Sequence, residues 1–201
     1  MNISIATEDI LTEEAMIKII ASHGKFNILH RLGKQGCGYL TSNLNKFNTL
    51  AKSHFVIIVL DLDNRQSSAE FRRLIEDQIK NKSGHLKIII PVREIESWLL
   101  ADREGLSNFF SISKEKIDRE PEILLDPKEK IINLAKLSRD NNIKKGLPPK
   151  NGAAAKVGLS YNTLLSLFIR EHWSITRALE LSPSLKETIK FLDEISHSND
   201  F

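Results

Sequence analysis

The sequence predicts an α/β fold with a mainly parallel four-stranded sheet flanked by helices. Apolar runs alternate with amphipathic segments through the first half of the chain, and the run 56–60 contains no polar residue. A strand that is apolar at every position is typical of a parallel sheet covered by helices on both faces. Strands that alternate with helices of this length need right-handed crossovers, which makes neighbouring strands parallel.

Each element of this half has its own pattern. The expected strands are the apolar stretches 2–6, 26–32, 54–61 and 86–92. The expected helices show apolar residues at helical spacing over 12–22, 39–53 and 68–81. Thr12 is the expected N-cap of the first helix, because its hydroxyl can accept a backbone N–H in the first turn.

The second half of the chain predicts a helical extension. Helical spacing continues over residues 95–110, 128–138, 164–179 and 184–195, whereas 139–158 has the composition of a loop. Pro183, which lies between two serines, marks the start of the last helix. We therefore expect a first domain over residues 1–110 and a helical extension over residues 111–201 packed on it.

Composition excludes several classes of protein. No segment approaches the roughly 20 apolar residues of a membrane span, and the N-terminus lacks the order of a signal peptide, so we expect a cytoplasmic protein with no membrane association. Cys37 is the single cysteine, which excludes an internal disulfide and a cysteine-based zinc site. The net charge of +3 permits an anionic partner such as nucleic acid.

Acidic residues follow three of the four expected strands. Glu8 follows the first strand, Asp61 and Asp63 the third, and Glu94 and Glu96 the fourth. Because the carboxyl ends of parallel strands meet at one edge of a sheet, we expect these acids to gather there. Side chains repeat every two residues in an extended chain, so Asp61 and Asp63 should point the same way.

Such a gathering of acids predicts a metal site. Two carboxylates about 4 Å apart repel by roughly 4 kcal/mol at an effective dielectric near 20, so a cation must offset them. Carboxylate oxygens suit Mg²⁺ or Mn²⁺, and either ion would support phosphodiester chemistry. The alternative is structural: Asp9 or Asp63 taken singly would cap the following helix, and Arg93 would pair with the glutamates beside it.

The arrangement resembles a known family. An acid after the first strand, a crossover unit and an Asp-x-Asp after the third strand are similar to the Toprim domain of topoisomerases, primases and OLD-family nucleases. The stretch 91–102, PVREIESWLLAD, resembles small Toprim-like proteins of unknown function found beside phage-defence ATPases. The resemblance covers about residues 1–110.

The resemblance implies roles for individual residues. Glu8 matches the glutamate that acts as general acid or base or binds metal, and Asp61 and Asp63 match the metal pair. The chain departs from the family in having Asp9 where many Toprim domains carry glycine, and Arg65 in place of a third acid. The missing third acid favours the nuclease branch over the topoisomerase branch, and Asp9 leaves the local turn and full activity open.

A basic segment follows in the second half. Four lysines lie in or near a Gly- and Pro-containing stretch: Lys144, Lys145, Lys150 and Lys156. They are either a solvated linker or a loop that contacts phosphates. Lys150 and Lys156 are the two we assign to nucleic-acid binding, since Toprim nucleases commonly hold a lysine near the metal.

The leading hypothesis is therefore a magnesium-dependent Toprim-type nuclease that acts on DNA or RNA. Glu8, Asp61 and Asp63 are its expected catalytic residues, and Glu94 or Glu96 completes the metal shell. The resemblance also implies a role in phage defence with an ABC-type ATPase as partner. A homo-oligomer of the chain is a further possible assembly. The alternatives are a non-catalytic sensor or partner-binding subunit of an ATPase complex and, third, a receiver-like phosphoryl-transfer domain.

Overall fold

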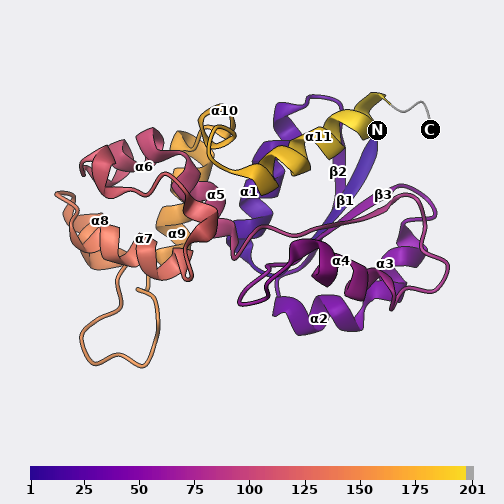
Figure 1. Cartoon of the computed structure of the whole chain (residues 1–201), viewed down its shortest axis with the longest axis horizontal. Coiled ribbons are helices and arrows are strands. Elements are labelled where there is room, and N and C mark those ends of the chain that lie inside the picture. The colour runs from indigo at the N-terminus through magenta and orange to yellow at the C-terminus, as the bar shows by residue number, and fades with distance from the viewer. Residues whose placement is uncertain (198–201) are drawn as a thin grey trace. The chain divides into compact units, whose positions relative to one another are not determined.

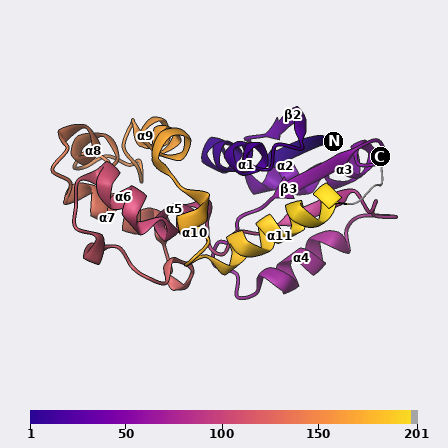
Figure 2. The same ribbon diagram turned by 90° about the horizontal axis from the view of Figure 1, so that it is seen from above.

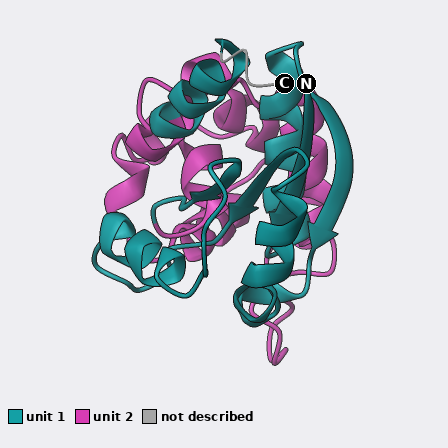
Figure 3. Ribbon diagram, turned by 90° about the vertical axis from the view of Figure 1, so that its right-hand side faces the viewer, with its two compact units in different colours: residues 1–92, 186–201 teal, residues 93–185 magenta. Residues whose placement is uncertain are grey.

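A computed structural model of the chain describes residues 1–197 and divides it into two compact units. Unit 1 comprises Met1–Val92 and the chain from Lys186 on, and unit 2 comprises Arg93–Leu185 (Figure 3). This division differs from the expected one, because the boundary lies after Val92 rather than after residue 110. The last helix also belongs mainly to unit 1 rather than to an extension.

Unit 1 contains a four-stranded sheet with every neighbouring pair parallel, as the sequence predicts. Its strands are β1 (Asn2–Thr7), β2 (Asn27–Gly33), β3 (Phe55–Val59) and β4 (Leu86–Ile89), in the order β2-β1-β3-β4. At the carboxyl end of β1, Thr7 lies beside Gly33 of β2 and Val59 of β3. The loops after these three strands therefore begin at one level of the sheet.

Helices cover both faces of this sheet (Figures 1 and 2). They are α1 (Ile10–Ser22), α2 (Gly36–Ser42), α3 (Leu44–Leu50), α4 (Ser68–Glu76) and α11 (Pro183–His197). A core cluster joins alternate residues of β3, such as Val56 and Ile58, to Phe47 of α3 and Phe71 of α4. On the other face lie α1 and α11, and the Nζ of Lys87 on β4 lies 5.1 Å from the ring centroid of Phe191 on α11.

Local hydrogen bonds explain where the helices of unit 1 differ from expectation. Helix α1 begins at Ile10 and is capped by Asp9 rather than Thr12: the Asp9 Oδ1 accepts the Thr12 N–H at 2.9 Å. The helix expected over 39–53 is two short helices that meet at Asn43, where φ is −112°. Helix α4 ends at Glu76, five residues earlier than expected.

In the described residues of unit 2 the regular structure is helical. Its elements are α5 (Ile95–Ala101), α6 (Arg103–Phe110), η1 (Lys114–Lys116), η2 (Pro121–Ile123), α7 (Pro127–Lys136), α8 (Asn141–Gly146), α9 (Tyr161–Leu167), η3 (Phe168–His172) and α10 (Ile175–Ala178). Trp98 and Trp173 are both buried in its core. Their indole N–H groups are satisfied, because Trp98 donates to the Ser184 Oγ at 2.7 Å and Trp173 donates to the Trp98 carbonyl at 3.1 Å.

Three expected elements of this unit are interrupted. The helix expected over 95–110 breaks at Asp102, whose carboxylate accepts the Gly105 N–H at 2.9 Å and so starts α6. The segment expected as a loop over 139–158 contains α8, and the helix expected over 164–179 is divided among α9, η3 and α10. Within residues 1–197, none of the helices has both the length and the apolar character that crossing a membrane requires.

Gly33 sets the close approach of β2 to β1 beneath the candidate site. It has φ +93°, and a Cβ added there would lie 2.2 Å from the Thr7 carbonyl oxygen. We therefore predict that Gly33→Ala destabilises the protein by about 1–3 kcal/mol in urea unfolding, because both backbone strain and a backbone clash oppose it.

Gly38 provides the matched control for this substitution. It lies inside α2, and a Cβ there would meet nothing within 4 Å. Gly38→Ala should be neutral or stabilise by up to about 1 kcal/mol. Equal stabilities for the two variants would contradict the role assigned to Gly33.

Candidate functional site

The order of the strands reverses between β1 and β3, and we call the position outside the carboxyl ends of these two strands the β1–β3 crevice. The chain runs from β1 to β2 on one side and then returns past β1 to form β3 on the other side. In open α/β sheets, ligands bind at such a reversal, outside the carboxyl ends of the strands. Glu8 directly follows β1 and Asp61 lies two residues beyond β3, so both flank this crevice.

A hydrogen bond joins the two loops that flank the crevice. The Glu8 Oε1 accepts the backbone N–H of Asp61 at 2.9 Å. The segment around Asp61 is also held on its other side, since Leu60 donates to the Ile89 carbonyl at 3.0 Å and Leu62 donates to the Pro91 carbonyl at 3.2 Å. The Asp61 side chain is buried, with 7% of its surface exposed. Two acids that lie 53 positions apart in the sequence thus meet in the fold.

The environment of Glu8 disfavours its negative charge. Partial burial raises the pKa of Glu8, the hydrogen bond from the Asp61 N–H lowers it, and the charges of Asp63 and Asp9 raise it further. The net pKa is raised above the usual value for a glutamate. Arg65 acts in the opposite direction with the smallest influence of the five. The acids that follow β1 and β3 therefore lie within electrostatic reach of one another.

Asp63 does not continue the extended chain that carries Asp61. Its φ of +51° places it in the left-handed region. The expectation that Asp61 and Asp63 point the same way assumed an extended chain, so it does not hold for Asp63. The Asp63 Oδ2 lies 3.3 Å from the Nη1 of Arg65, with side-chain exposures of 50% and 42%. An ion pair that is this exposed contributes about 0–1 kcal/mol, so a competing cation could displace Arg65.

Asp9 caps the helix that follows it, which was the structural alternative to metal binding for this residue. Its carboxylate caps α1, as described above, and its carbonyl accepts the Thr7 hydroxyl at 3.1 Å. Its charge still raises the pKa of Glu8. Asp9 is therefore a neighbour of the candidate site whose side chain is committed to the helix N-terminus.

The start of α2 also contacts the loop that carries Glu8. The sequence did not predict this contact. The Lys34 N–H donates to the Thr7 carbonyl at 2.7 Å, and the Gly36 N–H donates to the Glu8 carbonyl at 2.9 Å. Burial raises the pKa of the Cys37 thiol, and the charge of Glu8 raises it further. The glycine-rich stretch after the second strand was the sequence feature that could have predicted this contact, because it begins at the same sheet edge as the acids.

Glu94 and Glu96 belong to unit 2, where a lysine compensates both. The Lys128 Nζ lies 3.3 Å from the Glu94 Oε2 and 3.6 Å from the Glu96 Oε1. Glu96 is 1% exposed and also accepts the Tyr161 hydroxyl at 2.9 Å. Lys128 therefore supplies positive charge beside both of these acids. Their membership in a metal shell stays a prediction.

Lys150 and Lys156 lie in an exposed loop of unit 2 that extends from α8 and α9 (Figure 1). Its ends are joined, because the Gly158 N–H donates to the Leu147 carbonyl at 2.7 Å. Residues 136–156 contain six lysines or arginines and one aspartate, a net +5 against +3 for the whole chain. All six cations are exposed and form no ion pair with any residue that the structure describes. The segment is therefore a concentrated basic surface.

Of the acids that follow β1 and β3, Glu8 has an environment that an added cation would relieve, whereas Asp63 already faces Arg65. In residues 1–197, no three His, Cys, Asp or Glu side chains already form a group that could hold a metal ion. Glu8 supplies a carboxylate beside the Asp61 backbone, and the raised pKa of Glu8 is what an added cation would reverse. Asp63 could join them only after leaving Arg65.

Comparison with known proteins gives one result. The model of a family described as Domain of unknown function (DUF4276) matches residues 6–190, which include the end of β1, the other three strands, the candidate site and all of unit 2. Neither the curated proteins nor the solved structures contain a match. Because the matched region covers most of the 201 residues, the chain belongs to the DUF4276 family.

Proposed function

We propose that this protein is a Toprim-type nuclease that uses Mg²⁺ or Mn²⁺ to hydrolyse phosphodiester bonds in DNA or RNA. The observation that carries the proposal is the hydrogen bond between Glu8 and the Asp61 backbone at the β1–β3 crevice. It brings the acid after β1 to the acids after β3, as the resemblance to Toprim domains implies. Phage defence and an ABC-type ATPase partner are the setting that the same resemblance implies.

Each residue of the crevice has a proposed task. Glu8 and Asp61 hold the ion, and Asp63 joins them when Arg65 turns away. A bound Mg²⁺ would lower the pKa of a water molecule and neutralise charge that develops on the phosphoryl oxygens. The alternative task for Glu8 is to accept a proton rather than to hold the ion, because burial raises its pKa and so makes its carboxylate a better proton acceptor than an ordinary glutamate.

The basic segment 136–156 supplies the contacts to nucleic acid. Its exposed cations face solvent without competing ion pairs, so phosphates can pair with them directly. Contacts of this kind give affinity without reading sequence, which is what a nuclease of broad specificity needs. Lys150 and Lys156 are the members of the segment that lie in the loop.

Two observations favour a second function, that of a sensor or partner-binding subunit without catalysis. Asp63 is paired with Arg65, and Asp9 is committed to capping α1. A protein that kept the Toprim fold without binding metal could retain both interactions permanently. The two functions differ in whether the crevice binds metal at all.

The first prediction concerns catalysis. Glu8→Gln and Asp61→Asn should each lower metal-dependent cleavage by about a hundredfold or more, because each removes a negative charge from the proposed metal site. Gln at position 8 can still accept the Asp61 N–H, so the fold should survive, as circular dichroism would check. Glu70→Gln is the control, since Glu70 is an exposed acid in the first turn of α4. Full activity in both site variants would refute the assignment.

The second prediction concerns metal binding, which separates the two functions. Calorimetric titration with Mg²⁺ and Mn²⁺ should detect binding, and Arg65→Gln should tighten it up to about fivefold because Asp63 no longer has a competing cation. Arg73→Gln, an exposed arginine of α4, should leave the affinity unchanged. No binding at millimolar metal by any variant would favour the sensor.

The third prediction concerns the loop lysines. Lys150→Ala and Lys156→Ala should each weaken binding of the chain to nucleic acid and reduce the slope of log affinity against log salt by about one. Fluorescence anisotropy with labelled DNA and RNA at several salt concentrations measures both quantities. Lys52→Ala, an exposed lysine of unit 1, serves as control. An unchanged salt slope in the double variant would exclude the loop from the interface.

A further inference from the structure

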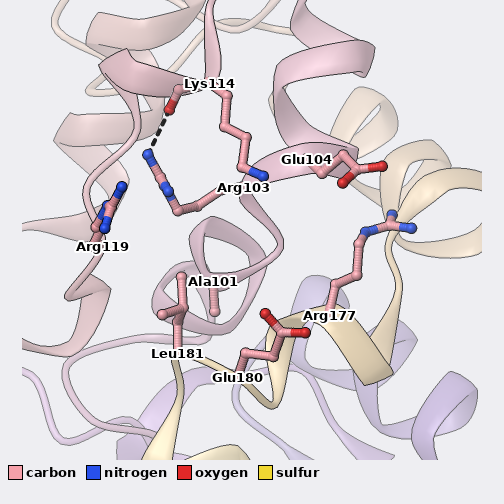
Figure 4. Close-up of a pocket in the computed structure, with 8 residues that line it drawn as sticks. All are labelled: Ala101, Arg103, Glu104, Lys114, Arg119, Arg177, Glu180 and Leu181. Atoms are coloured by element: carbon pink, nitrogen blue, oxygen red, sulfur yellow. Dashed lines mark hydrogen bonds between the residues drawn. The ribbon is translucent and has the colours of Figure 1, made fainter.

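Unit 2 contains a pocket of about 290 Å³ that includes none of the residues discussed so far as a candidate site (Figure 4). Its charged lining residues are four cations and two acids: Arg103, Lys114, Arg119, Arg177, Glu104 and Glu180. Ala101 and Leu181 add an apolar part to the lining. The volume is close to the lower end of the range for small-molecule sites.

Arg177 is held in place by a buried acid. Its Nε donates to the Asp102 Oδ1 at 2.6 Å and its Nη2 donates to the Asp102 Oδ2 at 2.9 Å, while Asp102 is 0% exposed. Asp102 also accepts the Ser174 N–H at 2.7 Å. Gly105 makes room for this pair, because a Cβ there would lie 2.3 Å from the Asp102 carboxylate. None of these bonds uses the Nη1 of Arg177, so that end of the guanidinium can donate to a ligand.

Arg103 is oriented in a similar way, by backbone carbonyls. Its Nε donates to the Ile117 carbonyl at 2.8 Å and its Nη2 donates to the Lys114 carbonyl at 2.9 Å, the second of which is drawn in Figure 4. Again the Nη1 takes no part in these bonds. Two guanidinium groups are therefore oriented before any ligand arrives, which reduces the entropy lost on binding.

The other two cations of the pocket form no ion pair with a described residue, although the charge of Lys114 helps to lower the pKa of the adjacent Glu115. Both of them, Lys114 and Arg119, are exposed. In Figure 4, Arg103 and Arg119 lie on one side of the pocket, and Glu104, Glu180 and Arg177 lie on the other. The pocket thus has a cationic side and a side of mixed charge.

The difference in charge between the two sides of the pocket favours a ligand with a phosphate at one end and hydroxyl groups at the other. Guanidinium groups bind phosphate oxygens with paired hydrogen bonds, so the cationic side suits a phosphate. The carboxylates of Glu104 and Glu180 would repel a compact polyanion but can accept hydrogen bonds from sugar hydroxyls. We propose that this pocket binds the phosphorylated sugar of a nucleotide, with the phosphate toward Arg103 and Arg119 and the sugar hydroxyls toward Glu180.

Two sources could supply this group, a free mononucleotide or the 5′-phosphorylated end of a nucleic-acid strand. Calorimetric titration of the full chain without metal should detect adenosine 5′-monophosphate and ribose 5-phosphate, both more tightly than inorganic phosphate or ribose. Anisotropy should then compare one labelled oligonucleotide with and without its 5′-phosphate. A preference for the phosphorylated oligonucleotide identifies a strand end, and its absence alongside mononucleotide binding identifies the free nucleotide.

Substitutions of lining residues test whether the ligand binds in this pocket. Lys114→Gln and Arg119→Gln should each weaken ribose 5-phosphate binding by about tenfold, because each removes a charged hydrogen-bond donor. Lys116→Gln, an exposed lysine of the same 3₁₀ turn that does not line the pocket, should have no effect. Glu180→Ala should reduce the preference for ribose 5-phosphate over inorganic phosphate. No saturable binding at millimolar ligand, or equal binding by all four variants and the parent chain, would overturn the proposal.

Discussion

The parallel pairing of β1 with both β2 and β3 is the constraint on which the candidate site depends. Because the strands run in the same direction and Thr7 lies level with Gly33 and Val59, three loops begin at one sheet edge. Those loops come from distant parts of the sequence and share no local signal. Their convergence therefore depends on the sheet, and the sheet depends on the helices that bury its two faces.

Three partly or fully buried glutamates show how the protein compensates buried negative charge. In the part of the chain that the structure describes, two of them face a lysine, and the third, Glu8, does not. Glu13, at 3% exposure, lies 2.6 Å from the Lys34 Nζ, and Glu96 lies near Lys128 and accepts the Tyr161 hydroxyl. Glu8 has a backbone amide instead, and its pKa remains raised. A cation added to this protein would therefore stabilise the ionised form of Glu8 in particular, which is the physical reason to place a metal there.

The sequence predicted the sheet better than the helices, and the reason is physical. Strands such as β3 are apolar at every position, so their burial is visible in the sequence. The break at Asp102 depends on Ser174 and Arg177, more than 70 positions away, and no local pattern reveals those partners. The left-handed conformation of Asp63 was missed because aspartate adopts it more readily than most residues, without a glycine to mark it.

The proposed phosphodiester cleavage would draw on both units of the chain. Acids that could hold metal follow the strands of unit 1, where Arg65 already faces an acid. Residues 136–156 of unit 2 contribute six exposed cations that form no ion pair with a described residue, and oriented arginines line the pocket of this unit. The family match over residues 6–190 extends through both units, so the acids and the cations occur together in one family region. Under the proposed function, unit 2 would contact the anionic substrate and the acids of unit 1 would take part in the reaction.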